Sequence, residues 1–187
     1  MQQLEDLSRL IAQHTEADGI VETAIPRLSL VRMSKPTEPM QGVQQPALCL
    51  IAQGSKQVIL ADEIYDYGPA RHLIASADLP ITGQVLAASQ AKPYLSLKLD
   101  LDMNALAALV MEVPIASSSA SPSKSCGKAL CLSRTDPKLM DAALRLVSLL
   151  DTPDDIPVMA PLIEREILYR LLRGDQAAKL RRMLMPE

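Results

Sequence analysis

The stretch that decides the fold is a predicted strand in which apolar and polar side chains alternate. It reads Tyr94-Leu95-Ser96-Leu97-Lys98-Leu99-Asp100-Leu101. Successive side chains of a strand point to opposite faces, so the four leucines lie on one face and the polar residues, with Tyr94, on the other. The leucine face must pack on an apolar layer. The strand alone leaves open whether the polar face points into the protein or into solvent.

Turn residues divide the chain before this strand into further short strands. We predict strands at residues 48–53, 56–60, 64–67, 73–76 and 82–87, each ended by turn-forming residues. Two more are predicted at residues 19–25 and 28–33, and a last short one at residues 129–132. Residues 34–46 contain three prolines and are predicted to form a loop. Short strands at this spacing are typical of an antiparallel sandwich or barrel.

Apolar residues recur at helical intervals near both ends of the chain, which predicts helices there. Residues 4–14 carry one apolar stripe, and Asp102 is placed to cap a short helix at residues 103–111. After residue 133 we predict one helix with Pro137 in its first turn and a second that opens at Pro161 and ends at Gly174. The serine-rich residues 117–127 are predicted to form a loop. The expected fold is α+β, with an N-terminal helix and a barrel or sandwich in residues 1–132, and helices in residues 133–187.

Composition and charge exclude several classes of protein. With 48% hydrophobic and 22% charged residues, the 187-residue chain is not intrinsically disordered. Its net charge of −3 lacks the basic excess that is typical of nucleic-acid-binding domains. No apolar run approaches the ~20 residues that a membrane helix needs, and the acidic N-terminus is unlike a signal peptide. We therefore expect a cytoplasmic protein without membrane contact.

Chemistry-bearing motifs are missing from the sequence. Three widely spaced cysteines and two histidines form neither a disulfide framework nor a metal-ligand pattern, so we expect no metal and no cofactor. Glycine-rich phosphate loops and the nucleophile and zinc-protease motifs are also missing, which argues against an enzyme.

Three residues are candidates for binding a ligand. His72 lies where a predicted loop enters a strand, a place where binding residues often gather. Tyr94 and Lys98 share one strand face. If that face points inward, the phenol and the ammonium need polar partners, which a ligand or a neighbouring carboxylate could supply. If it points outward, both are ordinary surface residues.

An apolar stripe on the second predicted C-terminal helix has two interpretations. It includes Ile163, Ile167, Leu168 and Leu171. In the first interpretation, it packs on the preceding helix and the strands of the same chain. In the second, it is shared with another subunit of a homodimer.

Several segments resemble the N-terminal domain of AraC-type transcriptional regulators. Residues 47–58, ALCLIAQGSKQV, are similar to the family's "cliaQGsK.v" signature. The other similar segments follow in the family's order, at residues 65–67, 73–80, 87–89, 93–97, 150–153 and 160–172. Together they span most of residues 4 to 185.

The resemblance implies a cupin-like antiparallel β-barrel that senses a small-molecule effector and helps form a homodimer. It also implies that DNA is bound only through a helix-turn-helix domain, which we expect to lie outside this chain. The effector's identity does not carry over from relatives, because Arg71 and His72 depart from the family pattern. Two other functions remain open, a stand-alone cupin-like enzyme and a dimerisation module that binds no ligand.

Overall fold

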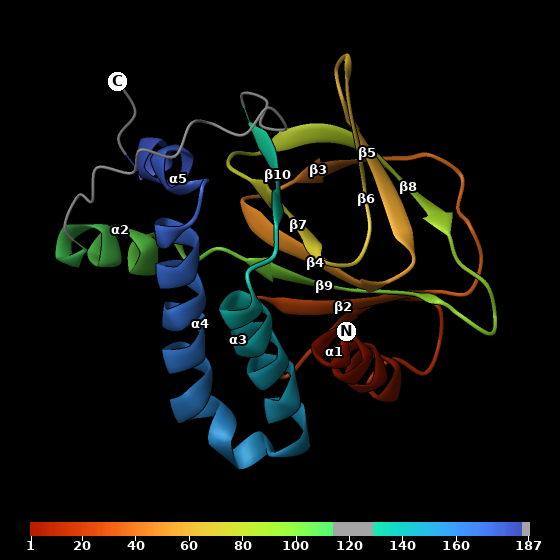
Figure 1. The fold of residues 1–187 in the computed structure, drawn as a ribbon, viewed down its shortest axis with the longest axis horizontal. Helices are drawn as coiled ribbons and strands as arrows, with labels where there is room; N and C mark the ends of the chain where they lie inside the picture. Colours follow the sequence, from red (N-terminus) through yellow and green to blue (C-terminus); the bar gives the residue numbers. More distant parts are fainter. Residues whose placement is uncertain (114–128, 185–187) are drawn as a thin grey trace.

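The computed structural model describes residues 1–113 and 129–184. Its strands form two antiparallel sheets that face each other, and helices cover the outer side of the larger sheet (Figure 1). The larger sheet has the order β1 (Gly19–Glu22), β2 (Leu28–Met33), β9 (Tyr94–Asp100), β4 (Ala47–Gln53), β7 (Arg71–Ala75), β10 (Leu130–Arg134). The smaller sheet has the order β3 (Met40–Gln44), β8 (Leu79–Ala87), β5 (Ser55–Leu60), β6 (Glu63–Tyr67).

The alternating strand is central to the larger sheet, as its pattern predicts. Leu97 of β9 lies between Leu30 of β2 and Leu50 of β4. All three side chains belong to a core that the helices complete. These helices are α1 (Gln2–Gln13), α2 (Met103–Glu112), α3 (Pro137–Ser148), α4 (Ile156–Arg173) and α5 (Ala177–Leu184). The other face of the sheet contributes to a second, smaller core between the sheets.

The expected α+β class, N-terminal helix and C-terminal helices are confirmed. The sheets are cupin-like in facing each other, but the prediction of a barrel is wrong in one respect, since β1 and β10 end the larger sheet without pairing to the smaller one. Residues before and after the expected boundary at 132 share one core, which contains both Leu7 and Leu171. The two-part division of the chain stays a prediction.

Three local expectations also need correction. Strand β3 lies within the predicted loop 34–46, and α4 begins at Ile156 instead of Pro161. Pro161 therefore lies inside the helix, where it cannot donate the usual bond to the carbonyl four residues earlier. Cys49 is free, but Cys131 is disulfide-bonded, which the cysteine spacing did not predict. The predicted serine-rich loop at residues 117–127 lies outside the described residues.

Candidate functional site

The polar face of β9 points into the space between the two sheets. Lys98 pairs in register with Cys49 of β4, and Cys49 pairs with Leu73 of β7. Leu73 and Tyr94 both belong to the core between the sheets. Side chains of directly paired residues share a face of the sheet, so Tyr94, Lys98 and Cys49 all face inward. We call this surface the inner face.

Two buried tyrosines give the inner face hydrogen-bonding groups. Tyr94 lies on β9, and Tyr67 comes from β6 of the opposite sheet. Burial raises the pKa of the Tyr94 phenol, and its hydrogen bond with Ser96 opposes that shift. Burial also raises the pKa of Tyr67 well above its usual value. Both phenols therefore stay neutral and can donate to a polar ligand.

Two lysines differ in how their charges are compensated. The Nζ of Lys98 lies 3.2 Å from Asp100 Oδ1, on the same strand and face. Lys56 comes from β5 and crosses the backbone of Gly83, where an added Cβ would lie 3.3 Å from Lys56 Cε. Among the described residues, no carboxylate lies within ion-pair distance of Lys56. One ammonium at the inner face thus has no counter-charge from residues 1–113 and 129–184.

Charges from both sheets act on the Cys49 thiol. Burial raises the pKa of the thiol, the charges of Lys56 and Lys98 lower it, and the charge of Asp100 raises it. The two ammonium groups, one from each sheet, therefore act on the same point of the inner face. A positively charged spot beside neutral phenols favours a ligand with a carboxylate or another acceptor-rich group.

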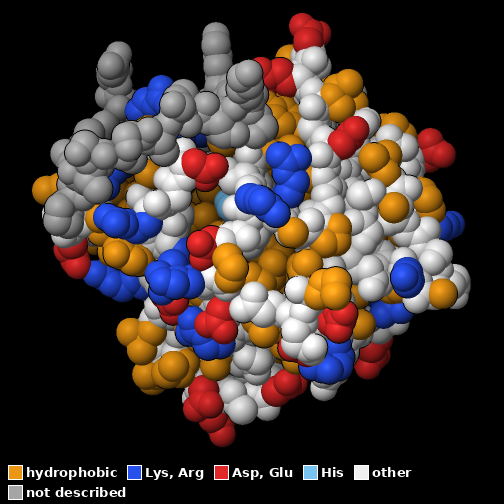
Figure 2. Space-filling view, viewed as in Figure 1, with side chains coloured by type: hydrophobic (Ala, Val, Ile, Leu, Met, Phe, Trp, Pro, Cys, Tyr) orange, Lys and Arg blue, Asp and Glu red, His pale blue; other side chains and the backbone are white. Residues whose placement is uncertain are grey.

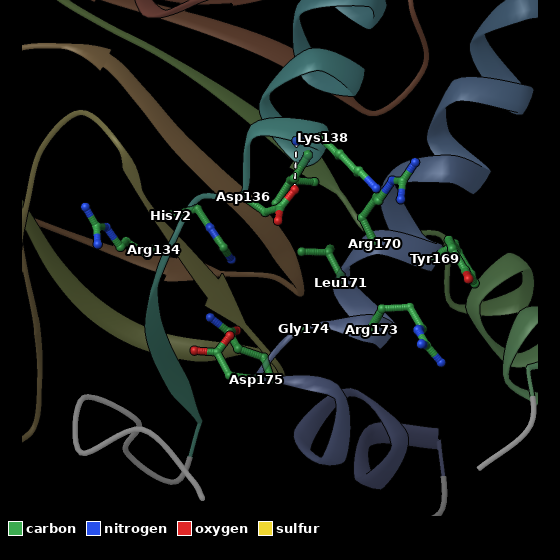
Figure 3. Close-up of a pocket in the computed structure, with 12 residues that line it drawn as sticks. His72, Arg134, Asp136, Lys138, Tyr169, Arg170, Leu171, Arg173, Gly174 and Asp175 are labelled. Atoms are coloured by element: carbon green, nitrogen blue, oxygen red, sulfur yellow. Dashed lines mark hydrogen bonds between the residues drawn. The ribbon is translucent and has the colours of Figure 1, made fainter. Parts of the chain in front are cut away.

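His72 lies on the opposite face of the larger sheet from Tyr94 and Lys98. It pairs with Leu50 of β4, and Leu50 pairs with Leu97, whose side chain faces the helices. His72 is only 5% exposed, and its Nδ1 lies 3.1 Å from Thr135 Oγ1. Its ring borders a cavity beside α3 and α4 (Figure 3). The structure brings Tyr94 and Lys98 together but does not bring His72 to them.

The apolar stripe predicted for a dimer interface is buried within this chain. Ile163, Ile167, Leu168 and Leu171 are all in the core that α4 forms with the sheet and the other helices. They present no surface to a second copy. The exposed apolar side chains of α4 are instead Val158, Met159, Leu162 and Tyr169.

The described residues contain neither a candidate metal site nor a membrane-spanning helix. Among residues 1–113 and 129–184, no three His, Cys, Asp or Glu side chains are grouped so that they could hold a metal ion. In the same ranges, every helix is too short or too polar to cross a membrane.

The fold and its inner face define an α+β domain with facing sheets and a helix-covered outer side. The sequence model described as AraC-type transcriptional regulator N-terminus matches residues 24–179. The chain therefore belongs to this family of regulator domains. None of the curated protein sequences matches this chain closely enough to count as a relative.

Two solved structures of ToxT share the fold. Apo ToxT K231A from Vibrio cholerae strain SCE256 has a TM-score of 0.53 at 8% identity, covering 81% of this chain and 58% of that one. ToxT from Vibrio cholerae O395 bound to (E)-4-(8-methylnaphthalen-1-yl)but-3-enoic acid has a TM-score of 0.52 at 11% identity. The match covers 80% of this chain and 56% of that one. The AraC-like transcriptional activator CuxR has a TM-score of 0.44 at 12% identity, covering 80% and 52%. This chain thus spans little more than half the length of the ToxT structures.

Proposed function

We propose that this domain senses a small-molecule effector at the inner face and regulates transcription in an AraC-type protein. The single observation that carries the proposal is the ammonium of Lys56, which has no ion-pair partner within the described residues and, with Lys98, acts on the Cys49 thiol. A charge without a partner in a partly buried place is costly unless something else binds it. An effector with a carboxylate would supply that partner. The carboxylic acid bound to ToxT is an example of this ligand chemistry.

The position of Tyr94 supports the same ligand chemistry. Its phenol has a proton that it can donate to a ligand, and the core residues around it, including Ile51 and Val58, are apolar like the carbon skeleton of an organic acid. A ligand held by a few polar groups in an apolar surround is the usual arrangement of a small-molecule site.

Strand β9 offers a path from the effector to the helices. Lys98 projects from one face of β9, and its neighbours Leu97 and Leu99 project from the other into the helical core. A ligand that binds more tightly to one position of β9 would favour one packing of α1, α3 and α4 over another. Regulation needs only such a difference in affinity between two states.

The partners follow from this role. We propose that the domain forms a homodimer through the exposed side of α4, and that DNA is bound by a helix-turn-helix domain outside this chain. We also propose that it acts in the cytoplasm and has no catalytic activity. The net charge of −3 supports the assignment of DNA binding to another domain.

The test is native mass spectrometry of the 187-residue protein purified without denaturation. We expect a fraction of the protein to carry a small organic acid, and this fraction to be lost in Lys56→Met. Lys92→Met, which removes an exposed lysine elsewhere, is the matched control and retains the ligand. Protein that carries no adduct, and that gains thermal stability from no member of a panel of organic acids, would favour the dimerisation module without a ligand. A stoichiometric transition metal would favour the cupin-like enzyme.

A further inference from the structure

A cavity lies outside the inner face, on the helical side of the larger sheet. It has a volume of about 580 Å³ and lies between β10, the start of α3 and the end of α4 (Figure 3). We call it the α3–α4 cavity. Figure 2 shows basic side chains gathered, with some acidic ones, on the face of the molecule that carries these elements.

The lining of the α3–α4 cavity is more basic than the protein as a whole. Four lining residues are cationic, and two, Asp136 and Asp175, are anionic, which gives a local balance of 4 − 2 = +2 in a chain of net charge −3. The four cationic residues are Arg134, Lys138, Arg170 and Arg173. A local excess of this sign attracts anions.

The two acids in the lining already have partners on their own side of the cavity. Asp136 caps α3, where its Oδ1 accepts a hydrogen bond from the backbone N–H of Lys138 at 2.7 Å. Asp175 Oδ2 accepts a hydrogen bond from the hydroxyl of Ser133 at 3.2 Å. Neither carboxylate forms an ion pair with a cation of the lining within the described residues.

The cations, in contrast, are poorly compensated. Lys138 has no ion-pair partner among the described residues and extends toward Arg170 (Figure 3). Arg170 shares Glu166 with Arg145, and its buried Nε has no hydrogen-bond partner among the described residues. Lys138 and Arg170 carry like charges, and Arg170 Nε still has a hydrogen to donate. An anion that binds between the two side chains would stabilise both.

Two buried polar side chains, His72 and Gln176, also line the cavity. His72 is 5% exposed, and its ring projects toward the cavity with Nδ1 held by Thr135, which leaves Nε2 for another partner (Figure 3). Gln176, 3% exposed, donates through Nε2 to Ser133 Oγ, while its Oε1 has no partner among the described residues. Buried polar atoms in native proteins are almost always hydrogen-bonded, so the unpartnered Gln176 Oε1 supports a bound molecule here.

We propose that the α3–α4 cavity binds a small organic anion, whose carboxylate or phosphate group lies between Lys138 and Arg170 and whose other polar atoms meet His72 Nε2 and Gln176 Oε1. The acceptor Oε1 favours a ligand that also carries a hydroxyl or an ammonium group. Burial lowers the pKa of His72 to about 4, so the ring is neutral near pH 7 and acts by hydrogen bonding instead of by charge. This site is separate from the inner face, which lies across the sheet.

The histidines make the test selective, because the chain has only His14 and His72. His14 is in the N-terminal part of the chain and does not line the cavity. Its Nε2 lies 2.9 Å from Asp151 Oδ1, and it serves as the internal control. The 187-residue protein, labelled with 15N at histidine, is titrated with sodium malonate and, separately, with inorganic phosphate at constant ionic strength. We expect the His72 ring resonances to shift saturably with at least one probe, with a dissociation constant on the order of 1 mM or lower. The His14 resonances stay in place.

A matched pair of lysine variants tests where the anion binds. Lys138→Met raises the dissociation constant for the anion by at least about tenfold, because a charge-assisted contact is lost. Lys92→Met leaves it unchanged. Lys138 is exposed, so the variant folds, which an unchanged His14 spectrum verifies. Saturation with malonate alone or phosphate alone identifies the anionic group. The proposal is overturned if neither probe saturates below about 50 mM, or if Lys138→Met binds as the wild type does.

Discussion

Arg27 holds Glu164 with two hydrogen bonds, from its Nε at 3.2 Å and from its Nη2 at 2.6 Å, both to Oε2. Arg27 lies in the turn between β1 and β2, and Glu164 lies on the buried side of α4. The pair therefore ties the edge of the larger sheet to the helix. Arg27 keeps this position with a φ of 68°, in the left-handed region that is unfavourable for a residue with a side chain.

Removing the charge of Glu164 should destabilise the fold. We expect Glu164→Gln to lower the free energy of unfolding by about 1–2 kcal/mol, because Arg27 loses the charge of its buried partner and keeps only Asp102, at 4.0 Å. Urea denaturation measures the change. Glu112→Gln is the control, since Glu112 and its partner Arg165 are both exposed and such pairs contribute about 0.5 kcal/mol or less. Equal effects of the two substitutions would show that the buried pair has no special role.

His72 should make the protein sensitive to acid. Its pKa is lowered by burial from 6.5 to about 4 in the folded state, so the unfolded chain binds more protons between these pH values. The associated stability is present above pH 6.5 and is lost as the pH falls toward 4, by about 2–3 kcal/mol. Between pH 7 and pH 4, wild type should therefore lose this much more unfolding free energy than His72→Gln. Parallel stability curves for the two proteins would contradict the buried, neutral histidine.

The outer and inner sides of α4 should respond differently to substitution. Val158 and Leu162 are 67% and 57% exposed, so the double change Val158→Asp with Leu162→Asp leaves the fold intact and dissociates the proposed dimer. Ile167 is 1% exposed, and Ile167→Ala lowers the free energy of unfolding by about 2–5 kcal/mol. Sedimentation measures the mass, and urea denaturation the stability. A wild type that is monomeric at tens of micromolar, or a double variant that stays dimeric, would exclude this interface.

The ion pair between Lys98 and Asp100 should contribute modestly to stability. Both side chains are about one-third exposed, and pairs of this kind contribute about 0.5–1 kcal/mol. A double-mutant cycle with Lys98→Met and Asp100→Asn measures the coupling energy between them. A coupling energy near zero would mean that Lys98 is as free to bind an effector as Lys56 is.

The strand pattern explains why much of the sheet could be predicted. Residues 94–101 alternate strictly, and the structure places Leu97 and Lys98 on opposite faces of β9 as that pattern requires. Strand β3 could not be found in the same way, because it is an edge strand whose first four residues are exposed and carry no apolar alternation. Pro161 misled the helix assignment, since Pro157 is the proline that lies in the first turn of α4.

The arrangement of the candidate site could not be predicted from one strand, because it depends on how strands pair and how the two sheets face each other. The pattern of β9 places Tyr94 and Lys98 together, but their inward direction follows from the second sheet. His72 faces the helices because it pairs with Leu50, a register set by tertiary structure. Lys56 was not predicted as a site residue, because its effect on the Cys49 thiol joins residues from the two different sheets. The buried state of Ile167 likewise follows from the packing of α4 on α3 and α2.

The central claim, that an effector binds at the inner face, is tested most directly by calorimetry on Lys56→Met. The organic acid identified by native mass spectrometry is titrated into wild type, Lys56→Met and the control Lys92→Met. We predict that Lys56→Met binds at least about tenfold more weakly with an unchanged melting temperature, because Lys56 has no carboxylate partner in the described residues to lose. Wild-type affinity in Lys56→Met would exclude Lys56 from the effector site.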